Sequence, residues 1–159
     1  LIPKLIRHFD VPVISAGGVG DATGLKRMLD LGASGISVGS PFIATLESQV
    51  SEDYKQACVD YSDSDIVMTT RLSGTPCTVI NTPYVQKTGT TQSAASSFLG
   101  KSRFLKKIVK MFTFYRGMKA LEKAANEVTY KTVWCAGPTI KYTNKIESVD
   151  QVVNRLTSF

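Results

Sequence analysis

The first sixteen residues carry two apolar patterns of different period. In residues 1–8 the apolar side chains recur at helical spacing, which predicts the end of an amphipathic helix. Residues 11–16 are instead a nearly continuous apolar run that stops at Gly17-Gly18. A short run of this kind is typical of a strand buried on both faces of a parallel sheet. We therefore expect a helix followed by a buried strand.

The same order of elements follows directly. Residues 22–31 have helical periodicity, with Asp21 placed as an N-cap and Gly32 just beyond the end of the helix. A second apolar run, residues 35–38, stops at Gly39. Strand, glycine turn, helix, strand and glycine turn together predict a βαβ unit with a parallel sheet.

Beyond residue 50 the pattern is less regular, and no internal repeat is present. Two short β-rich runs flank a Ser-Gly-Thr-Pro segment and predict a hairpin, and a later stretch of small polar residues predicts a loop. The elements expected in this part are a helix at 52–61, strands at 66–72 and 77–80, a loop at 88–102, helices within 103–125 and a helix at 148–156.

Composition limits the class of protein. The chain has 159 residues, 43% hydrophobic and 20% charged, so it can bury the core of one ordinary domain. No window resembles a transmembrane helix or a signal peptide. Three unevenly spaced cysteines and one histidine favour neither a disulfide framework nor a metal site, and they suit a reducing, cytoplasmic location. Because the chain begins with Leu1, we expect an N-terminal part to be missing.

The net charge of +6 arises from one segment. No acidic residue lies between residues 66 and 121, where nine basic residues lie. Lys106, Lys107 and Lys110 fall opposite an apolar stripe, as in a solvated helix face, although an acidic partner such as a carrier protein is an alternative. The aromatic residues fall on the apolar stripe rather than among the basic residues, which argues against nucleic-acid binding.

The two glycine turns carry the candidate chemistry. Each follows a predicted parallel strand, and ligands of parallel α/β folds bind at the carboxyl ends of the strands. A glycine lets the backbone N–H groups approach a phosphate closely, and Ser40 followed by Pro41 could cap a short helix. The alternative is that the glycines only turn the chain. The candidate phosphate-binding residues are Gly17, Gly18, Ser37, Val38, Gly39 and Ser40.

These residues also carry a family resemblance. The segments 11–19, 31–33 and 38–45 resemble the nitronate monooxygenase family, also called 2-nitropropane dioxygenases, and the likeness continues through 81–84 and 134–137. It spans most of the chain. The resemblance implies an FMN-dependent (β/α)8 TIM barrel, related to flavin-dependent enoyl-acyl carrier protein reductases, in which backbone groups at Gly18 and Ser37–Ser40 hold the FMN phosphate.

The resemblance also implies a domain arrangement. Residues 1–50 would be the last two strands and helices of the barrel, residues 51–133 a smaller helical, substrate-side subdomain, and residues 134–159 a return segment ending in a helix. The expected partners are a small-molecule alkyl nitronate, the N-terminal half of the barrel and, as an open alternative, a second copy in a homodimer. No nucleic-acid or membrane partner is expected.

The sequence departs from the family pattern in several places. The family usually has Gln and Thr where this chain has Ser37 and Ser40, and Pro138 opens a different continuation after Gly137. The catalytic histidine of the family lies in an earlier glycine-rich loop that nothing here matches. His8 ends a helix on the other side of the barrel, so we assign no catalytic residue in this chain.

The implied activity is oxidation of alkyl nitronates by O2 to a carbonyl compound and nitrite. An enoyl-acyl carrier protein reductase that uses NAD(P)H is the close alternative. A barrel fragment or split subunit that binds a phosphate ligand without turnover is the alternative from another class.

Overall fold

The chain forms two compact units. A computed structural model describes residues 1–72, 75–91, 111, 114–115, 117–119 and 133–159. The first unit contains Leu1–Ser48, Tyr54–Asp63 and Gly137–Phe159, and the second contains Gln49–Asp53 and Ser64–Ala136. The first unit is therefore assembled from segments far apart in the sequence.

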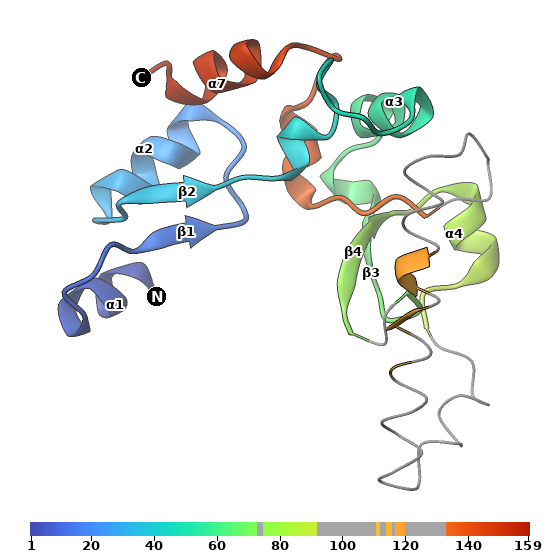
Figure 1. Ribbon diagram of the computed structural model, residues 1–159, viewed down its shortest axis with the longest axis horizontal. Coiled ribbons are helices and arrows are strands. Elements are labelled where there is room, and N and C mark those ends of the chain that lie inside the picture. Colours follow the sequence, from blue (N-terminus) through green and yellow to red (C-terminus); the bar gives the residue numbers. More distant parts are fainter. Residues whose placement is uncertain (73–74, 92–110, 112–113, 116, 120–132) are drawn as a thin grey trace, which may run out of the picture. The chain divides into compact units, whose positions relative to one another are not determined.

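The first unit begins with the expected helix and βαβ unit (Figure 1). Its elements are α1 (Ile2–His8), β1 (Ile14–Ala16), α2 (Ala22–Asp30) and β2 (Gly35–Ser37). Strands β1 and β2 are parallel, and Ile14 pairs with Gly35 while Ala16 pairs with Ser37. The parallel βαβ unit is confirmed, and both strands end at the same edge of the sheet.

Helix α2 begins and ends as its sequence predicts. The Asp21 carboxylate accepts a 2.8 Å hydrogen bond from the N–H of Gly24, which satisfies a donor that the helix itself leaves without a partner. At the other end, Gly32 has a φ of +92°, the left-handed conformation that glycine adopts without strain after a helix. Local capping signals thus fix the length of the connection between β1 and β2.

Later segments complete the first unit. These are the short 3-10 helix η1 (Ser40–Phe42), most of α3 (Glu52–Asp60), the 3-10 helix η4 (Pro138–Tyr142) and α7 (Val149–Thr157). Helix α7 packs against α2 and η1, and η4 packs against η1. A full capping box of Ser148 and Gln151 starts α7, and the carboxylate of Glu47 also accepts the N–H of Val149 at 3.0 Å.

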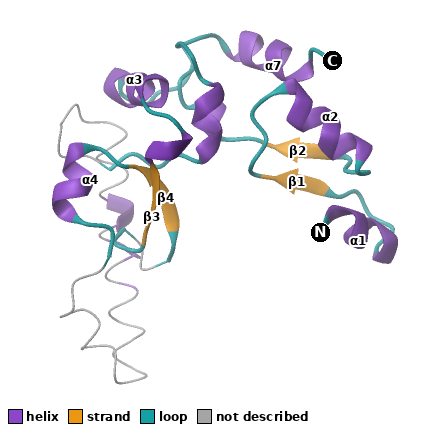
Figure 2. Cartoon of the chain, turned by 180° about the vertical axis from the view of Figure 1, so that it is seen from behind, coloured by secondary structure: helices purple, strands orange, loops and turns teal. Residues whose placement is uncertain are grey.

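The second unit contains a β-hairpin with a short helix beside it (Figure 2). The elements are β3 (Ile66–Thr69), β4 (Cys77–Ile80) and α4 (Pro83–Thr88); the 3-10 helix η2 (Asp63–Asp65) precedes them. The strands are antiparallel, which confirms the predicted hairpin. Leu72, Val79 and Val85 form a buried cluster that holds α4 against the strands.

Three expectations need correction or lie beyond the description. Strand β1 is not buried on both faces: Ile14 is 54% exposed, and Val11 before the strand is 63% exposed, because α2 packs mainly over β2. Helix α4 was not predicted, since its six residues are too few for a periodic signal. Most of the loop 88–102, most of 103–125 and the lysines 106, 107 and 110 lie outside the described residues.

No helix in the described part of the chain is long and apolar enough to span a bilayer.

Candidate functional site

The two glycine turns lie side by side. The N–H of Gly17 donates to the carbonyl oxygen of Ser37 at 3.3 Å, so the first turn starts exactly where the second strand ends. In Figure 1 the arrows of β1 and β2 point in the same direction and end on the same side. The fold therefore brings the six candidate residues to one edge of the parallel pair.

The first turn has an open side. Gly17 and Gly18 have φ values of +78° and +75°, which residues other than glycine rarely adopt. A Cβ placed on either residue would meet no atom within 4 Å. Among the described residues, no acceptor is found for the N–H of Gly18. The turn thus exposes a backbone donor, with space beside it for a ligand atom.

The second turn is open in the same way at Gly39. A Cβ there would also meet nothing within 4 Å, and its N–H has no acceptor in the described part of the chain. Ser37 is exposed, and the half-buried Val38 offers its backbone only. Each turn therefore leaves one backbone N–H without an acceptor among the described residues, and phosphate sites built from backbone groups use donors of this kind.

Ser40 does not have the predicted capping role. The 3-10 helix η1 begins at Ser40 with Gly39 as its N-cap, and no side chain caps it. The Ser40 Oγ instead accepts a 2.8 Å hydrogen bond from the N–H of Gly137. A serine hydroxyl that accepts one hydrogen bond still carries a proton to donate. Ser40 can therefore hold the return segment and a ligand oxygen at once.

The N-terminus of α2 is not available to an anion. Asp21 already accepts the N–H of Gly24 there, and its negative charge would repel a phosphate. The anion-binding capacity of the first turn therefore lies at Gly18 and not at the helix.

The opposite side of the first turn is closely packed. Gly20 is buried, and a Cβ on it would lie 2.5 Å from Cδ2 of Tyr142 and 3.1 Å from Cβ of Thr139. Only glycine fits this close approach of loop and η4. The Gly20 carbonyl accepts a 3.1 Å hydrogen bond from Nη1 of Arg155 on α7. One side of the loop is thus supported by protein while the other is open.

A cation accompanies η4. Lys141 Nζ lies 3.1 Å from a carboxylate oxygen of Asp63 and 5.4 Å from the centre of the Tyr142 ring. The hydrogen bond to Asp63 and its charge raise the pKa of Lys141, so the ammonium group keeps its charge through neutral pH. This lysine belongs to the segment in which the sequence departs from the family pattern.

Sequence reasoning missed the residues that support the turns. Tyr142 on η4, Glu147 in an isolated bridge with Thr45 and Arg155 on α7 carry no motif, and single residues of these types have no periodic signal. Their partners lie far away in the chain, 135 residues in the case of Arg155 and Gly20. The family resemblance includes Gly137 but does not predict its hydrogen bond to Ser40.

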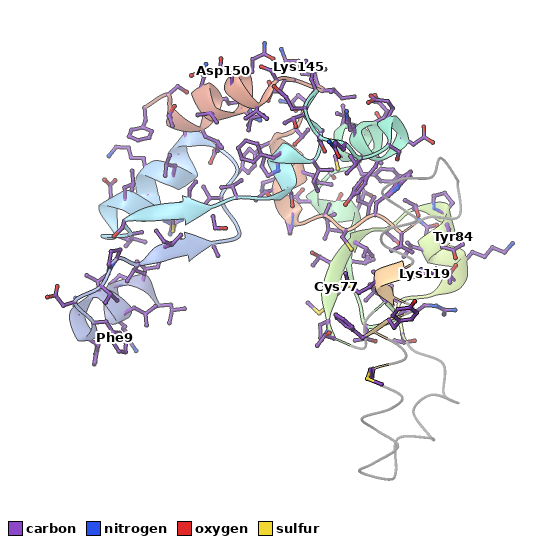
Figure 3. All side chains as sticks on the ribbon, in the orientation of Figure 1. Phe9, Cys77, Tyr84, Lys119, Lys145 and Asp150 are labelled. Atoms are coloured by element: carbon purple, nitrogen blue, oxygen red, sulfur yellow. The ribbon has the colours of Figure 1, made fainter. Side chains whose placement is uncertain are left out.

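His8 and the cysteines stand apart from this site. His8 is exposed at the end of α1, before β1, and its Nδ1 lies 2.8 Å from the carbonyl oxygen of Lys4. Cys58 is fully buried, whereas Cys135 is half-buried, as is Cys77, which Figure 3 labels. All three are free thiols. The described residues contain no group of three or more side chains suited to hold a metal ion.

Cys58 should be inert to alkylation in the folded protein. Burial raises its pKa to about 12, so at pH 8 only about one thiol in ten thousand is ionised. We expect iodoacetamide to label Cys58 only after denaturation. In the native protein its labelling rate should still rise above pH 9, where an ordinary thiol levels off. Peptide mass spectrometry measures both rates; equal labelling of native and denatured protein at pH 8 would contradict the burial.

Curated relatives of similar sequence are named as nitronate monooxygenases. The chain is 33% identical over 87 residues to a probable nitronate monooxygenase of Staphylococcus saprophyticus and 36% identical over 86 residues to one of Staphylococcus haemolyticus. These matches cover 55% and 54% of this chain, and 24% of each relative. The chain thus matches about a quarter of the length of these curated relatives.

Solved structures are similar over almost the whole chain. FabK from Thermotoga maritima superimposes with a TM-score of 0.74 and 26% identity, covering 99% of this chain and 47% of FabK. A nitroalkane oxidase from Streptomyces ansochromogenes gives 0.70 and 21% identity, covering 99% of this chain and 42% of the oxidase, and this likeness concerns the fold alone. A sequence model described as nitronate monooxygenase matches residues 1–158. The α/β chain belongs to the nitronate monooxygenase family.

Proposed function

We propose that this chain is part of an FMN-dependent nitronate monooxygenase, which oxidises alkyl nitronates with O2 to a carbonyl compound and nitrite. The observation that carries the proposal is the pair of open glycine turns at one edge of a parallel sheet, in a member of this family. Either turn alone would only reverse the chain. Two such turns at the ends of paired strands support a shared anion site, in which both turns would donate to one phosphate.

The residues present fit the phosphate of FMN. The N–H groups of Gly18 and Gly39 and the hydroxyl of Ser40 would donate to phosphate oxygens, and the open Cβ positions leave room for them. Bound FMN would supply the electron transfer that a protein side chain cannot provide. The part played by this chain is to hold the phosphate end and so orient the cofactor.

We propose that further strands of a TIM barrel cover the exposed side of β1. Val11 and Ile14 are more than half exposed, and Leu31 beyond α2 is 40% exposed. Apolar side chains of strands in parallel sheets are normally covered on both faces. The catalytic base would come from those other strands, because His8 lies at the amino end of β1 and not at the glycine turns.

The competing activity is that of an enoyl-acyl carrier protein reductase. The likeness to FabK, at 26% identity and a TM-score of 0.74, favours it as the second candidate. The phosphate site would be the same, and the difference would lie in the hydride donor and the substrate. A third candidate binds FMN without turnover, as a split or interrupted barrel would.

Two assays on the native protein separate these candidates. A nitronate monooxygenase should consume O2 and release nitrite with propionate 3-nitronate, and it should not oxidise NADH with an enoyl thioester. The converse result would establish the reductase and contradict our proposal. FMN binding with neither activity would support the non-catalytic alternative. Free FMN at the same concentration is the blank for both assays.

A further inference from the structure

Besides the strand pairing, an ion pair on the return segment links the segments that follow the two glycine turns. Arg155 of α7 donates to Glu147 Oε1 from Nη2 at 2.7 Å and from Nε at 3.1 Å. Its remaining nitrogen, Nη1, donates to the carbonyl of Gly20 at 3.1 Å. One planar guanidinium thus holds a carboxylate and the first turn at the same time. Lysine has a single nitrogen and cannot reproduce this fork.

Glu147 is itself fixed to the segment that follows the second turn. Its N–H donates to the carbonyl of Ala44 at 3.3 Å, and its carbonyl accepts the N–H of Leu46 at 3.0 Å. Ala44 and Thr45 are buried, with exposed fractions of 0% and 1%. Glu147 therefore does not move independently of the segment after η1.

The contacts form a continuous path. It runs from Gly39 through η1 to residues 44–46, across to Glu147, through Arg155 and back to Gly20. The exposed fractions of the two side chains are 30% for Arg155 and 11% for Glu147, so water screens the pair only partly. The donors at Gly18 and Gly39 can serve one phosphate only when the distance between the turns is fixed.

We infer that Arg155, held by Glu147, is a positioning residue that sets the two glycine turns at the spacing required by the FMN phosphate. The inference rests on the proposed function, because it needs a phosphate between the turns. Arg155 does not touch that phosphate; it acts through the Gly20 carbonyl. Its effect should therefore concern the phosphate end of the cofactor and not the flavin ring.

Comparison of FMN with riboflavin isolates this effect, because riboflavin has the same ring and no phosphate. We expect Arg155→Ala to weaken FMN binding by about tenfold or more, because the first turn loses the hydrogen bond from Arg155 to the Gly20 carbonyl and is held less firmly. Riboflavin affinity should change less than about twofold. Arg155→Lys should recover part of the FMN affinity. Flavin fluorescence titration of the native protein gives both dissociation constants.

Two further variants keep the test decisive. Lys26→Ala removes a cation from an exposed pair with Asp30 on α2, so it controls for a change of net charge and should leave both affinities unchanged. Arg155→Met keeps much of the length and packing of the side chain and replaces the alanine variant if that one does not fold.

The outcomes are distinct. Equal weakening of FMN and riboflavin by Arg155→Ala, or no weakening of either, would overturn the positioning role. If the unaltered protein binds FMN no better than riboflavin, the phosphate site fails, and the inference fails with it. The positioning role is supported if the Arg155 variants lose the preference for FMN over riboflavin while Lys26→Ala keeps it.

Discussion

Replacing Gly18 by valine should leave the purified protein without FMN. The φ of +75° at Gly18 is unfavourable for a β-branched residue, so the backbone must leave the conformation that exposes its N–H. The new side chain would also enter the open space beside the turn. A displaced phosphate would lose the charge-assisted hydrogen bonds from the N–H groups of Gly18 and Gly39. Loss of two such bonds costs about 3–6 kcal/mol, which lowers FMN affinity by more than a hundredfold. Absorbance of the bound flavin after purification measures the loss.

Two other glycines separate backbone strain from a clash with the ligand. Gly89 after α4 has a φ of +79° and open space around its Cβ position, so Gly89→Val carries a matched strain outside the turns. Gly39 has a φ of −122°, and Gly39→Val adds a side chain without the strain of a positive φ. We expect flavin loss with Gly39→Val and normal flavin with Gly89→Val. A folded Gly18→Val protein with full flavin content would refute the site.

Replacing Gly20 by alanine should destabilise the fold strongly. Its Cβ would lie 2.5 Å from Cδ2 of Tyr142, far inside van der Waals contact, and the site is buried. Overpacking of this kind costs about 1–3 kcal/mol in the free energy of unfolding. Because the shortest contact is with the Tyr142 ring, Gly20→Ala should be less harmful in a Tyr142→Ala background, where only the 3.1 Å contact with Thr139 Cβ remains. Urea denaturation of both single variants and the double variant gives the coupling energy.

Gly35→Ala is the matched control. Its Cβ would lie 3.4 Å from Cδ1 of Ile14, an ordinary contact with the flexible end of a side chain. We expect a change within about 1 kcal/mol, since nothing has to move far. Strictly additive effects of Gly20→Ala and Tyr142→Ala would show that the ring does not cause the destabilisation.

The sequence predicts the βαβ unit well because its signals are local. The apolar run before Gly17, the Asp21 cap and the left-handed Gly32 all lie within a few residues of the structure that they determine. The hairpin of β3 and β4 is predictable for the same reason. The glycine turns could be named as a candidate site because a parallel pair brings its carboxyl ends together.

Contacts between distant segments could not be predicted. Ser40 resembles a helix cap when only Pro41 is considered, yet its oxygen accepts the N–H of Gly137. The exposure of Ile14 depends on which other segments pack against β1. The apolar run in the sequence is the same whether or not such segments cover it. The residues that support the site are therefore paired only by the folding of the whole chain, and no local sequence pattern predicts these contacts.

The discontinuity of the first unit has a consequence for synthesis on the ribosome. Ser40 emerges 97 residues before Gly137, an interval of about 5–20 s at ordinary elongation rates. During this time the hairpin of β3 and β4, which emerges well before Gly137, can form, whereas the contacts of the glycine turns with η4 and α7 cannot. The loop-closure entropy of the late pairing is reduced if the intervening hairpin is already compact. The nascent chain should thus form its hairpin first and complete the edge that carries the glycine turns last.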